Sequence, residues 1–362
     1  MDKYRVISAD SHIIEPPDLW VRYIEPSYRD RAPHLERLPE GDVFKCEGVE
    51  LPPIPISSSA GNRRVAVTAK GRWEEVVRKG AYDPHERMKD MALDGMDAEV
   101  VYPTLALRMF EIADPALQRA IFAAYNSWIA DFCGAYPDRL KGIAMISLTG
   151  VESAMAEMRR VRKLGLAGAM VSIVPLGATY SGPAYDPFWA TAQELQLPVS
   201  VHINTNVHPL RNATMAEKSI LASHAQWCIA DLIFNGVFAR FPEIKVVSAE
   251  NDAGWAPYLM QRMDNLFEIH RHTYNFEIRD QGLRPSEFFR RNVYLTFMED
   301  RPAIIARDTI GGEHLMWSND YPHKESTFPH SQQVLQRMFE GVPEMDKQRI
   351  TCLNAARLYG FT

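Results

Sequence analysis

The sequence predicts an α/β protein of the (β/α)8 class, a TIM barrel with a long insertion after its first strand. Eight short runs of apolar and β-branched residues recur along the chain, and a segment with helix signals follows each of them. Most of these runs are continuously apolar, as is typical of parallel strands covered on both faces. The alternative, a doubly wound open sheet, usually has a glycine-rich turn after its first strand, where this chain reads DSHIIEPP. The barrel is therefore favoured.

The elements follow one another in a regular order. We expect strands at residues 4–9, 98–102, 140–147, 166–174, 198–203, 244–249, 293–297 and 314–318. We expect helices at residues 83–93, 115–136, 151–164, 186–195, 216–241, 255–272, 301–308, 329–339 and, at the C-terminus, 345–358. Gly95, Pro137 and Gly165 stand just after three of these helices, where helices commonly stop.

The number of domains depends on how residues 16–83 are interpreted. At about 150 residues per domain, the chain length alone suggests two domains. Residues 16–83 separate the first strand from its helix, and without them about 290 residues remain, close to the usual barrel size of about 250. Trp20, Phe44 and Trp73 make this segment too apolar for a disordered linker along its whole length. We predict one domain over residues 1–362, with 16–83 as a lid-like insertion over the barrel mouth.

Composition narrows the class of partner. Lys and Arg total 40 and Asp and Glu total 46, so the net charge is −6, whereas surfaces that bind nucleic acid or anionic membranes are normally basic. No apolar run approaches the roughly 20 residues that a spanning helix needs. The four cysteines are scattered, which argues against a disulfide framework or a thiolate metal site. We expect a cytoplasmic protein without a targeting segment that acts on a small molecule.

Residues with metal-binding side chains stand at three predicted strand ends. Asp10 and His12 follow the first strand at i and i+2 spacing, so both can point to the same face. His202 lies at the end of the fifth strand and Asp320 follows the eighth. Each residue alone is weak evidence, but active sites of TIM barrels form where the strands end. Two imidazoles and two carboxylates at one mouth predict a site for Zn²⁺, Mn²⁺ or Fe²⁺.

Further residues are candidates for catalysis or substrate contact. Glu250, after the sixth strand, is either a general base or a residue that orients a ligand. His323 and His224 are candidate catalytic residues on segments that follow strands eight and five. The candidates for contact with the substrate are Trp20, Tyr102, Arg108 and Met298.

The segments ISADSHIIEPPDLW, SVHIN and LMWSNDYPH resemble the amidohydrolase-related family, in particular its branch of aminocarboxymuconate-semialdehyde decarboxylase and γ-resorcylate decarboxylase. The resemblance extends over residues 4–359. It implies one divalent ion held by Asp10, His12, His202 and Asp320. The decarboxylases of this branch have a histidine shortly after strand six that shuttles a proton, whereas this chain reads AEND there, with Glu250 as the nearest ionisable residue.

The missing histidine bears on the predicted reaction. We predict a metal-dependent hydrolase with one Zn²⁺ or Mn²⁺, in which Glu250 or Asp320 takes a proton from a water that attacks a carbonyl-type carbon. The expected substrate is a small apolar or aromatic acid. The alternative is a non-oxidative decarboxylase of an aromatic or enoic acid, and a third hypothesis is a degenerate barrel that only binds a small molecule. The resemblance also implies a homodimer or a higher homo-oligomer.

Overall fold

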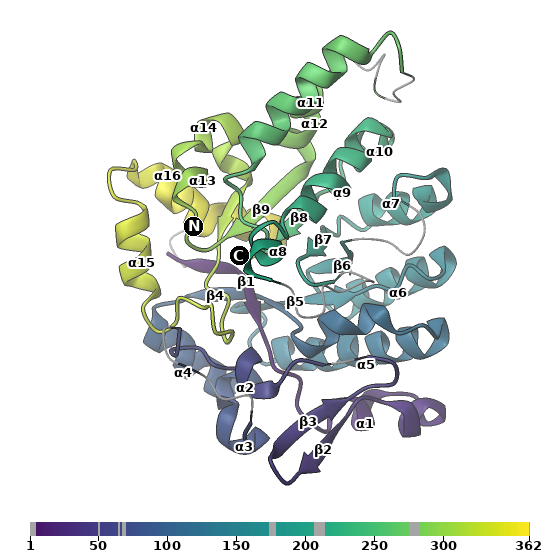
Figure 1. Cartoon of the computed structure of the whole chain (residues 1–362), viewed down its shortest axis with the longest axis vertical. Helices are drawn as coiled ribbons and strands as arrows, with labels where there is room; N and C mark the ends of the chain where they lie inside the picture. The colour runs from purple at the N-terminus through teal and green to yellow at the C-terminus, as the bar shows by residue number, and fades with distance from the viewer. Residues whose placement is uncertain are drawn as a thin grey trace.

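Eight parallel strands form the centre of the molecule, and helices surround them (Figure 1). The computed structural model describes residues 5–49, 51–63, 66, 70–173, 179–205, 214–274, 278 and 282–361. The order across the sheet is β1-β4-β5-β6-β7-β8-β9-β10. These strands are β1 (Ile7–His12), β4 (Ala98–Tyr102), β5 (Leu140–Met145), β6 (Gly168–Ser172), β7 (Val199–His202), β8 (Val246–Ala249), β9 (Val293–Phe297) and β10 (Leu315–Trp317). The predicted (β/α)8 barrel is confirmed.

Helices follow the strands and cover the outside of the barrel. They are α4 (Pro84–Asp94), α5 (Pro115–Gly134), α6 (Val151–Lys163), α7 (Asp186–Glu194), α8 (Met215–Ser219), α9 (Ser223–Phe234), α10 (Val237–Arg240), α11 (Ala256–His270), α12 (Pro285–Asn292), α13 (Arg301–Ile305), α14 (Arg307–Ile310), α15 (Ser331–Met338), α16 (Glu344–Gln348) and α17 (Asn354–Tyr359). The 3-10 turn η3 (Leu105–Glu111) follows β4. Among these described helices, none is both long and apolar enough to cross a bilayer.

Three of the predicted helices are interrupted. The segment 216–241 forms α8, which ends at Ser219, then α9, which ends at Phe234, and then α10. Between α9 and α10, Gly236 takes a left-handed φ of 73°. The segment 301–308 divides into α13 and α14 at Ala306, and 345–358 contains a π-helical turn. Helix α12 was not predicted, although its sequence has proline in the first turn and glutamate at the third position, two start signals.

The first strand lies further along the chain than predicted, at Ile7–His12 instead of 4–9. Asp10 and His12 therefore lie within the strand and not beyond it. The pairing of β1 with β4 contains one extra residue between Ser8 and Ser11, and such an irregularity re-aims the side chains of a strand. The last residues of β1 are polar because they contact polar partners inside the barrel. The apolar pattern that predicts a strand therefore stops before the strand ends.

Backbone and side-chain contacts join β1 to the segment after β10. The Asp320 N–H donates to the Asp10 carbonyl at 3.1 Å, and the His12 N–H donates to the Tyr321 carbonyl at 2.5 Å. Asn319 accepts from the hydroxyls of Ser8 and Ser11 at 3.0 and 2.8 Å. These bonds hold the last strand end beside the first, so side chains from the two ends of the chain meet at one mouth.

The insertion, residues 16–83, has structure of its own. Its helix α1 (Leu19–Tyr23) packs against α5, and β2 (His34–Leu38) pairs antiparallel with β3 (Gly41–Lys45). The hairpin lies with α1 at one edge of the molecule (Figure 1). Further along, the insertion contacts two strand-end segments: the Ala60 N–H donates to the Pro322 carbonyl after β10 at 2.9 Å, and Arg63 pairs with Glu299 after β9. Its function as a lid stays a prediction.

We expect Arg87→Ala to destabilise the fold strongly. The buried Arg87 guanidinium donates to Glu99 at 2.6 Å and to the His12 carbonyl at 2.7 Å. Removing one partner of a buried ion pair leaves a buried charge without compensation and costs about 3–5 kcal/mol of unfolding free energy. Urea denaturation measures this loss. The matched control is Arg22→Ala, which removes the exposed pair with Asp18 and should cost under about 1 kcal/mol. Equal losses in the two variants would contradict the prediction.

Candidate metal centre

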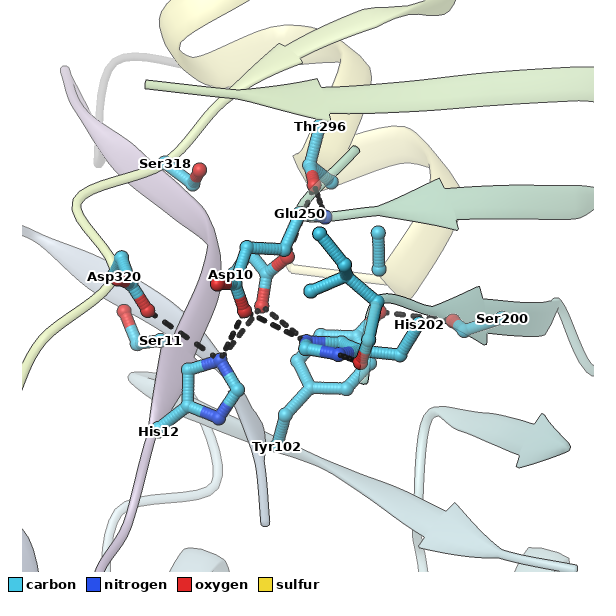
Figure 2. A network of polar contacts seen from close by, with 12 residues as sticks. Asp10, Ser11, His12, Tyr102, Ser200, His202, Glu250, Thr296, Ser318 and Asp320 are labelled. Atoms are coloured by element: carbon cyan, nitrogen blue, oxygen red, sulfur yellow. Dashed lines mark hydrogen bonds and ion pairs between the residues drawn. The ribbon is translucent and has the colours of Figure 1, made fainter. Parts of the chain in front are cut away.

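Acidic and imidazole side chains from four strand ends converge at the carboxyl end of the barrel. Asp10 and His12 come from β1, His202 from the last position of β7, Glu250 from the residue after β8, and Asp320 from the segment after β10. Figure 2 shows Asp10, His12, His202 and Glu250 pointing toward one another, with Asp320 beside His12. The structure thus brings together the four residues predicted as metal ligands. Glu250 lies in the same place as a fifth residue.

The separations between these side chains suit a shared cation. His12 Nε2 lies 3.4 Å from Asp10 Oδ1, 3.5 Å from Glu250 Oε2 and 3.5 Å from Asp320 Oδ1. His202 Nε2 lies 3.6 Å from Asp10 Oδ1 and 3.4 Å from Glu250 Oε2. Ligand atoms about 2.1 Å from one ion, at tetrahedral angles, are about 3.4 Å apart. Among the described residues, ligand-type atoms within 4.8 Å of one another form two groups that share His12: Asp10, His12 and His202 in one, and His12, Glu250, Asp320 and His323 in the other. This spacing fits an ion beside His12, with ligands drawn from both groups.

Several atoms at the centre lack hydrogen-bond partners. Within the described part of the chain, the buried atoms Asp10 Oδ1, His12 Nε2, His202 Nε2 and Asp320 Oδ2 have none. A buried polar atom without a partner costs about 1–3 kcal/mol, so four of them in one place call for an explanation. Two imidazole nitrogens with two carboxylate oxygens are a donor set for Zn²⁺ or Mn²⁺. The residues present therefore fit one divalent ion.

In both histidines, a hydrogen bond from Nδ1 fixes the direction in which Nε2 points. His12 Nδ1 lies 2.7 Å from the Pro103 carbonyl, and His202 Nδ1 lies 2.8 Å from the Ile203 carbonyl. A carbonyl oxygen only accepts, so each Nδ1 carries a hydrogen and donates it. In the neutral imidazole this leaves the Nε2 lone pair directed at the centre, which is the arrangement of metal-ligating histidines.

Thr296 of β9 supports the carboxylate side of the centre. Its hydroxyl donates to Asp10 Oδ2 at 2.9 Å and accepts from the Glu250 N–H at 2.8 Å. The sequence reasoning missed this residue, although a single polar residue inside the apolar run VYLTF is a signal for it. Glu250 and Asp320 have left-handed φ angles of 56° and 54°. Such conformations are costly for residues other than glycine and cluster at functional sites.

The charges of the centre favour a cation. Burial raises the pKa of the Asp320 carboxyl to about 8, and the nearby Asp10 charge adds to this shift. Burial alone would lower the pKa of His12, but the Asp10 and Glu250 carboxylates outweigh it and raise that pKa well above its ordinary value. The acids therefore attract positive charge, as protons or as a metal ion. A divalent ion replaces those protons when it binds.

His323 and Tyr102 lie against the centre. The His323 ring stands 4.1 Å from the His12 ring between centroids, and its Nδ1 lies 2.7 Å from Asp320 Oδ1. Burial, aided by the charge of His12, lowers the pKa of His323 to about 3. The Tyr102 ring is 5.2 Å from that of His202, and its hydroxyl is 2.8 Å from the Ser200 hydroxyl inside the barrel. Tyr102 thus packs beneath the histidines.

The other predicted site residues have different surroundings. Arg108, on η3, pairs with Glu111 at 2.5 Å. Trp20 is fully buried and packs edge-on against Phe44 of the same insertion, so its indole is part of the hydrophobic core. Substrate contact through these two residues stays a prediction. Met298 follows β9 and is half-buried, and His224 lies in the first turn of α9, also half-buried. Neither belongs to the metal-type clusters found among the described residues.

The fold and the strand-end centre define a metal-dependent enzyme class. An amidohydrolase family model matches residues 33–361. The chain therefore belongs to the amidohydrolase family and is an enzyme of that superfamily, as its motifs predict.

Similar proteins include several decarboxylases. The chain is 26% identical over 273 residues to a γ-resorcylate decarboxylase of Polaromonas sp., covering 68% of this chain and 78% of that protein. An amidohydrolase structure from Mycobacterium avium subsp. paratuberculosis aligns with a TM-score of 0.78 at 20% identity, over 99% and 100% of the two chains. A 5-carboxyvanillate decarboxylase from Novosphingobium aromaticivorans, solved with manganese and 4-hydroxy-3-methoxy-5-nitrobenzoic acid, aligns with a TM-score of 0.71 at 17% identity, over 99% and 96%. At these identities the two structures establish the fold.

Proposed function

We propose that this protein is a divalent-metal-dependent, non-oxidative decarboxylase of a small aromatic or enoic acid. The observation that carries the proposal is the decarboxylase relative, which matches more than two thirds of the chain, together with a buried donor set that fits one ion. The comparisons thus favour the alternative prediction over hydrolysis. The manganese in the decarboxylase structure supports Mn²⁺ as the ion to test first.

Each residue of the centre has a place in this reaction. Asp10, His12, His202 and Asp320 would hold the ion. When bound, the ion supplies positive charge that orients a substrate carboxylate and its neighbouring oxygen and offsets the negative charge of the site.

Glu250 would deliver the proton. A proton adds to the carbon that carries the carboxylate, the C–C bond to that carboxylate breaks, and its electron pair returns to the ring as CO₂ leaves. Glu250 Oε2 faces the centre, and the side chain is 19% exposed, against 0–2% for the side chains of the four ligands. It is therefore the residue of the five that can exchange its proton with solvent. This carboxyl would take the role of the histidine that the related decarboxylases have after strand six.

Hydrolysis is the second candidate function, and the Glu250 carboxylate also favours it. A carboxylate beside a metal centre can take a proton from water as well as give one to carbon. The two reactions differ in what leaves the substrate.

The direct test is product detection. Protein loaded with Mn²⁺ is incubated with 2,6-dihydroxybenzoate and with 5-carboxyvanillate, and CO₂ and the phenolic product are measured. The expected result is equimolar CO₂ and phenol, with one deuterium on the ring when the solvent is D₂O. Methyl esters of the same acids form the hydrolytic arm, and chelated protein is the control. Ester cleavage without CO₂ release by fully loaded protein would overturn the proposal in favour of hydrolysis.

A further inference from the structure

A buried carboxylate three residues after His12 holds the turn that follows β4. Glu15 is fully buried. Its Oε1 accepts from the N–H groups of Thr104 and Ala106 at 3.1 and 2.9 Å, and its Oε2 accepts from that of Leu105 at 2.9 Å. Three backbone hydrogen bonds to one carboxylate fix both the path and the orientation of this turn, because charge-assisted bonds are the strong ones.

That turn contacts the metal centre at two points. The Pro103 carbonyl accepts from His12 Nδ1 at 2.7 Å. The adjacent Thr104 hydroxyl lies 2.9 Å from His323 Nε2, and His323 Nδ1 lies 2.7 Å from Asp320 Oδ1. One short segment therefore orients the imidazole of a ligand and, through His323, the carboxylate of another.

The hydrogen bonds have a definite direction when Asp320 is an ionised ligand. Its oxygen then only accepts, so His323 Nδ1 donates, and His323 Nε2 accepts the hydrogen of the Thr104 hydroxyl. With Oδ1 bound to His323, the other oxygen, Oδ2, is the buried atom without a partner among the described residues. Both nitrogens of His323 then take part in hydrogen bonds, and its ring packs against that of His12.

We propose that Glu15 and Thr104 are positioning residues of the metal centre, with His323 as the link to Asp320. This inference rests on the proposed function, because it assumes that Asp320 and His12 hold an ion. It assigns His323 a role in orienting Asp320, in place of the catalytic role predicted from the sequence. In this arrangement Glu15 and Thr104 act on the ion only through the residues that they orient, and neither contacts the ion or the substrate.

The test compares metal affinity in isosteric variants. Thr104→Val removes the hydroxyl and keeps the shape, whereas Thr104→Ser keeps the hydroxyl. Mn²⁺ affinity is measured by competition with a chelator, and the absorption bands of the Co²⁺-loaded protein report ligand geometry. We expect Thr104→Val to weaken affinity about 10–100-fold and to shift the Co²⁺ bands, and Thr104→Ser to stay within about 3-fold of the parent, because residues that orient metal ligands act on that scale.

A matched control separates positioning from general stability. Thr327 is buried in the β10 loop, and its hydroxyl bonds to that of Ser331 at 2.6 Å. Thr327→Val removes a comparable hydrogen bond, and we expect parental Mn²⁺ affinity. Glu15→Gln should weaken affinity as Thr104→Val does, and the double variant should lose less than the product of the single losses, because both residues act through one turn.

The outcomes distinguish the inference from the proposed function. If the parent protein binds no Mn²⁺, Zn²⁺ or Co²⁺, the metal centre and the inference both fail. If the parent binds the ion and Thr104→Val binds it with the same affinity and the same Co²⁺ bands, the inference fails alone. Equal weakening in Thr104→Val and Thr327→Val would also overturn it. Since Thr104→Val leaves the buried carboxylate in place, the test does not depend on Glu15→Gln folding.

Discussion

Replacing His202 by alanine is expected to abolish metal binding. His202 Nε2 is buried, faces Asp10 and Glu250 at 3.6 and 3.4 Å, and has no hydrogen-bond partner among the described residues. The variant removes one of the four proposed ligands, which should weaken metal affinity by more than the roughly 10–100-fold lost with a residue that only orients a ligand. Metal analysis after Mn²⁺ loading and gel filtration should find under about 0.1 equivalent in the variant and about one in the parent.

A second measurement and a control accompany this variant. Saturating Mn²⁺ should raise the unfolding temperature of the parent and leave that of His202→Ala unchanged, because an ion stabilises only a folded state that binds it. His272→Ala replaces an exposed histidine beyond α11 and should retain the parental metal content. A full equivalent of metal in His202→Ala would show that His202 is not a ligand.

Replacing Glu250 by glutamine is expected to lower kcat while the metal remains bound. The amide keeps the size of the side chain but cannot deliver a proton in the same way. Loss of a general acid or base typically costs about 100- to 10,000-fold in rate. Steady-state CO₂ release at saturating substrate measures this effect, and metal analysis of the same sample measures occupancy.

The control for this variant is another carboxylate near the mouth. Glu325 is exposed, and its charge acts on Asp320 only through space. Glu325→Gln should stay within about 3-fold of the parental kcat, since surface charges act weakly through solvent. If Glu250→Gln loses its metal, Glu250 is a ligand and not the proton donor. Parental kcat with bound metal would remove Glu250 from the reaction.

The strands were largely predictable because they are buried on both faces. Continuous apolar runs mark such strands wherever they pair, and β4 and β9 have the predicted bounds. The first strand was placed too early because its last residues are Asp10, Ser11 and His12. Their strand conformation comes from pairing with β4 and from partners after β10, which local sequence does not reveal.

The residues proposed as metal ligands were predictable for a related reason. Strand ends of a parallel barrel meet at one mouth, so Asp10, His12, His202 and Asp320 were expected together before their distances were known. Glu250 was recognised as an ionisable residue at this mouth, but two roles stayed open for it. The structure places its Oε2 beside both imidazoles, and this placement makes the metal-content test decisive.

The orienting residues were not predictable. Glu15 reaches a turn 89 positions further along the chain, and Thr296 reaches Asp10 across 286 positions. Each is a common residue type with no local pattern around it. Their roles depend on the path of the turn after β4 and on the register of β9, which follow from closure of the whole barrel.

The sequence by itself determined the architecture and the chemical composition of the centre, because apolar periodicity and residue type are local properties of a chain. Only the tertiary structure decided the contacts around that centre: which carbonyl orients His12, which hydroxyl binds Asp10, and how Glu15 holds the turn from which Thr104 contacts His323. Those contacts join segments far apart in the chain, and their geometry follows from strand register and loop paths that the complete fold fixes together.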